Sequence, residues 1–288
     1  MKFDKNILSL FQRATDALEK ISNSNTTNNI EITSAKGFLW DSDKFKLIPI
    51  NKINAVDLDL LKGINHTKEI LLNNTLQFSE GYPANNVLLW GARGMGKSSL
   101  IKSIHKKISR ENKKYRLILI EIYRDDIKSL PKLISYLNEL NHRFIIFCDD
   151  LSFDNNETTY KSLKTVLDGG IMERSQNILF YATSNRRHLM PRAMIENEKS
   201  TSISPSESAE EKISLSDRFG LWLGFYQCSQ NDYLEIVNSY ANYYRLKINT
   251  QDLEKMAIEW SVTRGSRSGR VAWQFIQDLA GKLKINIK

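Results

Sequence analysis

The sequence predicts an α/β protein: a parallel sheet covered by helices on both faces, followed by a smaller helical domain. Five apolar runs have the length of buried strands, and segments of helical periodicity lie between them. A glycine-rich loop follows the first run, and after residue 226 the periodicity is helical only. The predicted strands cover residues 87–90, 117–122, 144–148, 178–182 and 221–226, and the helices between them cover residues 97–109, 130–140 and 160–167.

Three segments follow from this pattern. Residues 1–59 hold an amphipathic helix, over residues 1–22, and then an irregular segment of short apolar pieces. Residues 60–226 form the α/β domain, in which the Ser- and Glu-rich loop 196–214 is expected to be mobile. Residues 227–288 form the helical domain, where Ser229 and Asp232 predict a capping box at the start of the first helix.

The composition is typical of a soluble globular protein, with 41% hydrophobic and 26% charged residues among 288. No apolar segment approaches the ~20 residues of a membrane span, and charged residues interrupt any signal-like run near the N-terminus. The two cysteines, Cys148 and Cys228, predict neither a disulfide framework nor a zinc site, so we expect a cytoplasmic protein. The net charge of +8 is compatible with nucleic-acid binding, but lysine-rich helix faces account for it equally well.

The glycine-rich loop has the spacing of a phosphate-binding loop. Gly91, Gly96, Lys97 and Ser98 satisfy the pattern G-x-x-x-x-G-K-[ST]. Glycines let backbone N–H groups approach an anion closely, and the following helix adds the positive end of its dipole. The lysine neutralises the β- and γ-phosphates, and the serine hydroxyl binds Mg²⁺. The predicted nucleotide-binding residues of this loop are Gly91, Ala92, Arg93, Gly94, Met95, Gly96, Lys97, Ser98 and Ser99.

Polar side chains follow two later strands, at the edge where parallel sheets bind ligands. Asp149 and Asp150 follow the third strand. We predict that Asp149 binds Mg²⁺, directly or through water, and that Asp150 orients or deprotonates the attacking water. Asn185 follows the fourth strand, within the polar run 183–185, and is predicted to bond the γ-phosphate or the water. Turns at the strand ends are the alternative explanation for these residues.

Three later arginines complete the predicted site. Arg218 precedes the fifth strand, and we expect it to reach the γ-phosphate of a neighbouring subunit and stabilise the transition state. A surface pair of Asp217 with Arg218 is the alternative. Arg267 and Arg270 lie at the start of the last helix, where they either bind phosphate from one helix face or simply begin a basic helix.

In this order, the features resemble the AAA+ ATPases over roughly residues 60–285. Five stretches resemble the bacterial DUF815 family more closely: GYPANNVLLWGARGMGKSSL (81–100), FCDDLSF (147–153), YATSNRRHLMP (181–191), LSDRFGLWLGF (215–225) and RGSRSGRVAWQF (264–275). The resemblance implies five core strands in the order 5-1-4-3-2, numbered along the chain, and a C-terminal helical lid. It also implies that residues 91–98 are the Walker A motif, Asp149-Asp150 Walker B, Asn185 sensor 1, Arg218 the arginine finger, and Arg270 or Arg267 sensor 2.

The same resemblance makes ATP and Mg²⁺ the expected ligands and ATP hydrolysis the expected activity, in a homo-oligomer that acts on an unidentified protein partner. One departure from the family pattern affects the expected rate of ATP hydrolysis. Most AAA+ ATPases have Asp-Glu at the end of the Walker B strand, where this chain has Asp149-Asp150. Aspartate is one methylene shorter, and a misplacement of ~1 Å costs on the order of 10²-fold. The alternative is a low-turnover loader or switch, with DNA as a compatible partner. A small-molecule kinase fits less well, because the C-terminal segment is helical and no acceptor pocket is recognisable.

Overall fold

The computed structural model describes residues 13, 15, 16, 32, 35–111, 116–153, 159–168, 175–187, 189 and 215–287. The chain divides into two compact units, Met1–Ala35 and Lys36–Lys288, and the second contains every element below. The predicted helix 1–22 lies almost entirely outside the described residues, and the loop 196–214 lies wholly outside them. None of the described helices is long and apolar enough to cross a membrane.

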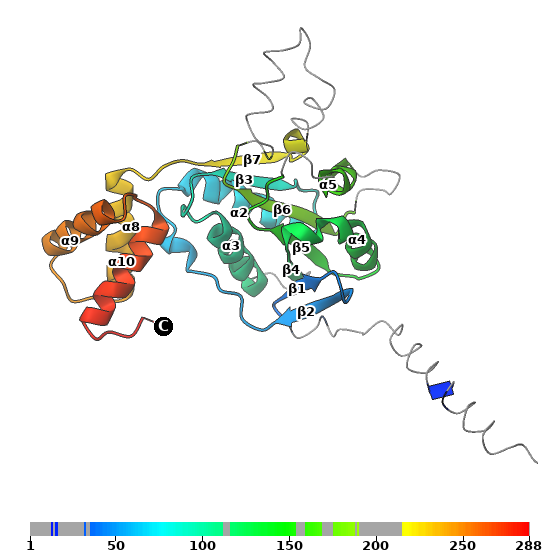
Figure 1. Ribbon diagram of the computed structural model, residues 1–288, viewed down its shortest axis with the longest axis horizontal. Coiled ribbons are helices and arrows are strands. Elements are labelled where there is room, and N and C mark those ends of the chain that lie inside the picture. Colours follow the sequence, from blue (N-terminus) through cyan, green and yellow to red (C-terminus); the bar gives the residue numbers. More distant parts are fainter. Residues whose placement is uncertain are drawn as a thin grey trace, which may run out of the picture. The chain divides into compact units, whose positions relative to one another are not determined.

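The second unit is built on a seven-stranded sheet in the order β2-β1-β4-β5-β6-β3-β7 (Figure 1). Only the pair β1–β2 is antiparallel among the described pairings, and all the others are parallel. The strands are β1 (Gly37–Asp41), β2 (Lys46–Ile50), β3 (Val87–Gly91), β4 (Leu117–Ile122), β5 (Arg143–Cys148), β6 (Ile178–Ser184) and β7 (Leu221–Phe225).

The prediction of five strands was therefore wrong in strand number, and the order 5-1-4-3-2 does not describe the whole seven-stranded sheet, although the five predicted strands keep that order among themselves when read from β7. Two more strands, β1 and β2, extend the sheet beyond β4, and the five predicted strands form the run β4-β5-β6-β3-β7. Residues 37–50 are thus not irregular. Strand periodicity is hard to recognise in this segment because each strand has only five residues. The turn between the strands contains Phe45 with φ 49°. Pro49 is tolerated because β2 is an edge strand.

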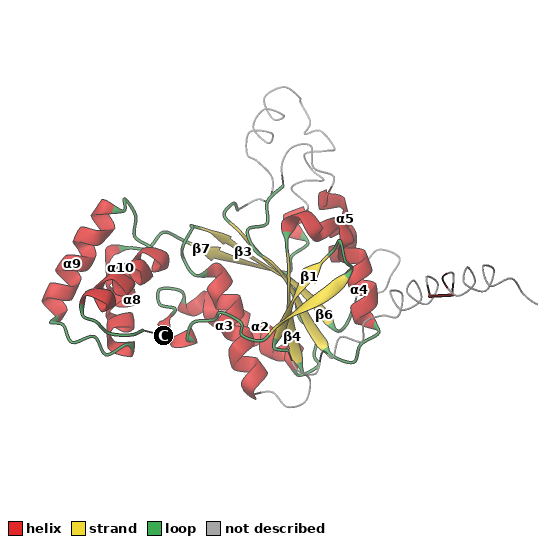
Figure 2. Ribbon diagram, turned by 60° about the horizontal axis from the view of Figure 1, so that its bottom comes forward, coloured by secondary structure: helices red, strands yellow, loops and turns green. Residues whose placement is uncertain are grey.

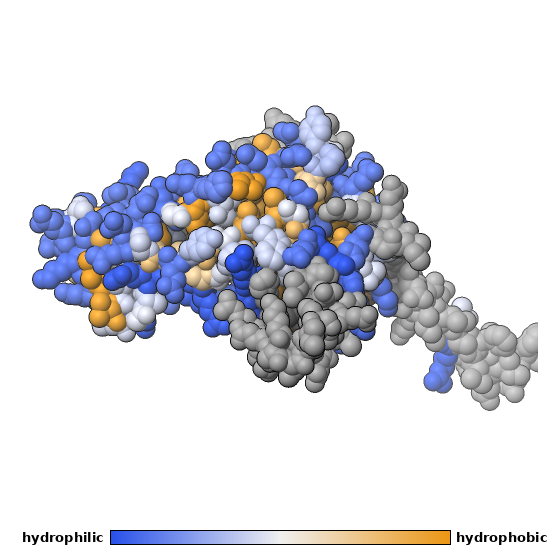
Figure 3. Space-filling model, turned by 90° about the horizontal axis from the view of Figure 1, so that it is seen from above, coloured by the Kyte–Doolittle hydropathy of each residue, from blue (hydrophilic) through white to orange (hydrophobic). Residues whose placement is uncertain are grey.

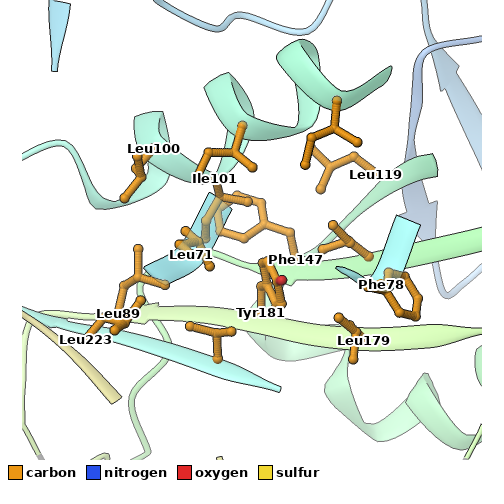
Figure 4. Close-up of a cluster of buried hydrophobic side chains, with 14 of the residues drawn as sticks. Leu71, Phe78, Leu89, Leu100, Ile101, Leu119, Phe147, Leu179, Tyr181 and Leu223 are labelled. Atoms are coloured by element: carbon orange, nitrogen blue, oxygen red, sulfur yellow. The ribbon is translucent and has the colours of Figure 1, made fainter. Parts of the chain in front are cut away.

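Helices cover both faces of the sheet (Figure 2). They are α2 (Asn65–Ser79), α3 (Lys97–Glu111), α4 (Leu130–Asn138) and α5 (Thr159–Asp168), with 3₁₀ turns η1 (Leu58–Leu60) and η2 (Arg124–Ser129). Alternate strand residues such as Leu89, Phe147 and Tyr181 pack with α2 and α3 in one buried cluster (Figure 4). Strand residues of the opposite parity, such as Leu88 and Ile146, are also fully buried, as expected for strands covered on both sides.

A second hydrophobic cluster belongs to the three C-terminal helices, α8 (Gln230–Tyr243), α9 (Thr250–Thr263) and α10 (Gly269–Lys282). The predicted capping box is confirmed: the Ser229 hydroxyl accepts from the Asp232 N–H, and the Asp232 carboxylate accepts from the Ser229 N–H. Ser268 caps α10 by accepting from the Val271 N–H. The surface seen in Figure 3 is mostly hydrophilic with smaller hydrophobic areas, in keeping with a composition of 26% charged residues.

A buried histidine on α3 links folding stability to pH. His105 is 1% exposed; its Nε2 bonds to the Leu117 carbonyl at 3.0 Å, and its Nδ1 has no partner in the part of the chain that the structure describes. Burial lowers the pKa of His105 from 6.5 to about 4. Between these two values the unfolded chain binds a proton that the folded chain does not bind. The contribution to stability is therefore complete above pH 6.5 and is lost as the pH falls towards 4, by about 3 kcal/mol.

Replacing His105 by glutamine is expected to remove this part of the pH dependence. We expect the fall in unfolding free energy between pH 7 and pH 4 to be smaller in His105→Gln than in the wild type by about 2–3 kcal/mol. Urea unfolding at both pH values measures it. His66→Gln is the matched control because His66 is exposed on α2. Equal pH dependence in the wild type and His105→Gln would contradict the assignment.

Candidate functional site

The loop between β3 and α3 has the backbone of a phosphate cradle. Gly91, Gly94 and Gly96 all have positive φ, at 121°, 73° and 88°. A Cβ on Gly91 would collide with the carbonyl oxygen of Phe225 at the end of β7, and the Ala92 N–H donates to that same oxygen at 2.8 Å. Strand β7 therefore holds the start of the loop, and α3 begins at Lys97 with its N-terminus beside it.

Lys97 lies inside this loop and is 7% exposed. Its Nζ donates to the carbonyl oxygens of Gly91 at 2.9 Å and Ala92 at 2.8 Å, and to Asn185 Oδ1 at 3.2 Å. Burial lowers the pKa of Lys97, against the opposing effect of the carboxylates of Asp149 and Asp150. The lysine charge is thus held between the loop, β5 and β6.

Asp149 and Ser98 come together at the start of α3. The Ser98 hydroxyl and the Thr183 hydroxyl both donate to Asp149 Oδ1, each at 2.5 Å. Asp149 follows Phe147 by two residues, so it is on the face of the sheet that α3 covers, and this is why Ser98 meets it. A hydroxyl and one carboxylate fit Mg²⁺, which uses few protein ligands and completes its shell with water and substrate phosphates.

Asp150 turns away from the strand and contacts Asn185. Its φ is 51°, in the left-handed region that non-glycine residues seldom adopt. Its N–H donates to Thr183 Oγ1 at 2.9 Å, and Asn185 Nδ2 donates to Asp150 Oδ1 at 2.5 Å. Because Asn185 also accepts from Lys97, its amide joins the acidic pair to the phosphate loop.

Of the two candidate arginines in α10 and before it, the structure brings Arg270 to the loop. The Arg270 N–H donates to the Gly94 carbonyl at 3.1 Å, and its positive charge contributes to lowering the pKa of Lys97. Arg267 precedes the cap residue Ser268 and lies outside the helix, so the expectation that Arg267 and Arg270 share a helix face was wrong. In the helical domain, burial raises the pKa of Cys228 and of Tyr233, and the charge of Arg267 opposes this by lowering both.

Arg218 is held near the opposite end of the strands from the loop. Its Nε donates to Asp168, the last residue of α5, at 2.5 Å. Strand β7 is parallel to β3, with Leu221 opposite Val87 and Phe225 opposite Gly91. Arg218 precedes the amino end of β7, whereas Gly91 lies opposite its carboxyl end, about 13 Å along the strand from Leu221. It is therefore not brought to the loop of its own chain.

The other loop residues have smaller roles in the geometry. The Arg93 charge also lowers the pKa of Lys97, and Met95 packs against both hydrophobic clusters. From the sequence, Thr183 is foreseen only as a member of the polar run 183–185, of which Asn185 is the predicted site residue, and Asp168 and Ser268 are not foreseen. Strand alternation identifies the side of the sheet on which Thr183 lies. Thr183 follows Tyr181 by two residues, and it therefore lies on the face that α3 covers. No sequence signal pairs Asp168 with Arg218, 50 residues away.

The sequence matches, over residues 33–283, the family described as protein of unknown function DUF815. The chain belongs to the DUF815 family. No curated protein sequence matches it significantly. The expected family is thus confirmed, while the family description itself specifies no activity.

Solved structures show which fold this DUF815 protein has. The RuvB Holliday junction branch migration motor of Thermotoga maritima is similar with a TM-score of 0.53 and 20% identity, over 80% of this chain and 66% of that one. A point mutant of the same RuvB protein gives 0.54 and 20%, over 80% and 67%. The Aeropyrum pernix ORC2 protein gives 0.46 and 14%, over 81% and 73%. The likeness to RuvB concerns the fold alone, an α/β fold with a mostly parallel sheet.

Proposed function

We propose that this DUF815 protein is a Mg²⁺-dependent ATPase that couples nucleotide state to the remodelling or recruitment of a partner protein. One observation carries the proposal. One hydrogen-bonded group beside the phosphate loop joins residues from three separate elements. These are Lys97 at the start of α3, Asp149 and Asp150 after β5, and Asn185 after β6. Turn formation at two strand ends does not require such a meeting, whereas phosphoryl transfer does.

Each residue then has a role that its position allows. The loop N–H groups and Lys97 bind the phosphates, and Ser98 and Asp149 hold Mg²⁺, which neutralises charge on the phosphates when bound. Asp150 orients or deprotonates the attacking water, and Asn185 reports on the γ-phosphate through its bonds to Asp150 and Lys97. Arg270, rather than Arg267, is the sensor 2 residue that we propose, because its N–H donates to the loop.

The two hydrophobic clusters support a division into an α/β domain up to residue 226 and a helical lid from residue 227. Met95, a residue of the phosphate loop, packs against both clusters, which supports a coupling between the lid and the nucleotide site. The two free buried cysteines support a cytoplasmic location. ATP rather than GTP is proposed from the resemblance of the sequence motifs to those of the AAA+ ATPases.

The second candidate is an ATP-dependent loader or switch with little turnover of its own. It is favoured by Asp150, whose short side chain is bonded to Asn185 and whose backbone is left-handed. The net charge of +8, and the likeness to RuvB, a Holliday junction motor, make DNA the partner to test. Binding that weakens linearly in log salt, or turnover stimulated by DNA, would support this candidate over the first.

Asp150→Asn tests the first proposal. We expect phosphate release from Mg-ATP to fall on the order of 10²-fold or more, because asparagine cannot accept the proton of water. Binding of a fluorescent ATP analogue should stay within about threefold of the wild type, since Lys97 and the loop remain. Asp43→Asn, at an exposed position in the turn between β1 and β2, is the control. Wild-type turnover in Asp150→Asn would remove Asp150 from the mechanism, and no turnover in the wild type would favour the switch.

A further inference from the structure

Thr183 is the first residue of β6 beyond the point where β5 ends. Strand β5 ends at Cys148, opposite Ala182, whereas β6 runs on to Ser184 because β3 still pairs with it. Thr183 lies opposite Leu89 of β3, is 2% exposed, and faces Asp149 and Asp150. Thr183 is therefore held in the sheet beside Asp149 and Asp150, which follow the end of β5.

The threonine makes three separate bonds to three consecutive residues. Its hydroxyl donates to Asp149 Oδ1 at 2.5 Å and accepts from the Asp150 N–H at 2.9 Å. Its carbonyl accepts from the N–H of Leu151 at 2.7 Å, and Leu151 is fully buried. The Asp149 carboxylate is thus held on the α3 side, next to Ser98.

The same bonds favour the unusual backbone of Asp150. A left-handed residue costs roughly 1–2 kcal/mol without local compensation, and Asp150 stands at φ 51° between two residues bonded to Thr183. In this conformation the Asp150 carboxylate lies against Asn185 while the Asp149 carboxylate lies against Ser98. Two adjacent carboxylates are thereby directed to two different partners.

We propose that Thr183 is the positioning residue of the site, whose hydroxyl sets Asp149 for the metal ion and Asp150 for the attacking water. This rests on the proposed function. A hydroxyl at this position can donate to one aspartate and accept from the backbone of the next at the same time. Valine has the same shape and can do neither, whereas serine can do both.

The test compares Thr183→Val and Thr183→Ser with the wild-type protein. Phosphate release gives kcat and KM, and binding of a fluorescent ATP analogue, titrated with Mg²⁺, gives the Mg²⁺ concentration at half-saturation. For Thr183→Val we expect kcat to fall on the order of 10²-fold and this Mg²⁺ concentration to rise about tenfold. Thr183→Ser should recover both quantities to within about threefold, because its hydroxyl keeps both bonds.

Thr75→Val is the matched control for the loss of a buried threonine hydroxyl. Thr75 is fully buried on α2, and its hydroxyl bonds to the Leu71 carbonyl and the Tyr181 hydroxyl, away from the aspartates. Thermal unfolding of all the variants identifies losses that come from destabilisation alone. A folded Thr183→Val protein with wild-type kcat and wild-type Mg²⁺ dependence overturns the inference. A wild-type protein that binds no Mg-ATP overturns the proposed function, and this inference with it.

Discussion

Replacing Lys97 by alanine is expected to reduce phosphate release from Mg-ATP on the order of 10²–10³-fold, the usual cost of removing a group that stabilises developing charge. The Lys97 Nζ donates hydrogen bonds to both the phosphate loop and Asn185. Its loss therefore removes charge from the centre of the site. Affinity for a fluorescent ATP analogue should fall as well, since the lysine contacts phosphates in both the ground state and the transition state.

The fold should survive this change. Burial lowers the pKa of Lys97, which means that the folded chain disfavours its charged form, so alanine removes an unfavourable burial together with three hydrogen bonds. Lys107→Ala is the control, because Lys107 is on the same helix and exposed. Phosphate release and thermal unfolding are measured for both. Turnover and affinity that equal those of Lys107→Ala would contradict a role for Lys97 in phosphate binding.

Sequence patterns foresee this site because the sheet is parallel. Once a phosphate loop follows one strand, residues after the other strands must lie at the same edge, and Asp149, Asp150 and Asn185 do so. Patterns alone do not show that Thr183 joins the two aspartates, since that depends on the register that places Cys148 opposite Ala182. The choice of Arg270 over Arg267 likewise depends on where Ser268 caps α10.

The sequence fails to predict β1 and β2 for a different reason. β1 and β2 have five residues each, and β2 buries only Leu47 fully, so neither gives an alternating pattern. Their pairing with each other and with β4 is a tertiary property that periodicity does not contain. The pair of Arg218 with Asp168 is of the same kind, because it joins the end of α5 to the segment before β7.

Arg218→Ala is expected to lower turnover on the order of 10³-fold while leaving nucleotide affinity within about threefold, as for an arginine finger supplied by a neighbour. Arg218 lies near the amino end of β7, whereas the loop lies at the carboxyl end of β3, so it cannot reach the site of its own chain. For the same reason specific activity should rise with protein concentration, as oligomers form. Phosphate release across a dilution series, with nucleotide binding measured in parallel, checks both expectations.

Mixing two inactive variants separates action in trans from any effect within one chain. Lys97→Ala protein keeps Arg218, and Arg218→Ala protein keeps an intact phosphate site. In randomly mixed rings with head-to-tail contacts, about a quarter of the sites pair an intact loop with an intact arginine from the neighbour. We therefore expect the equimolar mixture to regain a comparable fraction of wild-type turnover. A mixture as inactive as its two components would contradict the arrangement in trans.

The ion pair with Asp168 provides the control for this interpretation. Arg218 is 22% exposed and Asp168 40%, so the pair is partly screened and its own contribution to stability is modest, about 0–1 kcal/mol. Asp168→Asn removes the pair and keeps the arginine. If Arg218 acts on a neighbouring site, Asp168→Asn retains turnover, because the guanidinium that the neighbour needs is still present. If instead Arg218 only fixes α5 against the start of β7, Asp168→Asn should lose turnover as Arg218→Ala does, and mixing variants should not restore it. The arginine finger would then be another arginine of the chain.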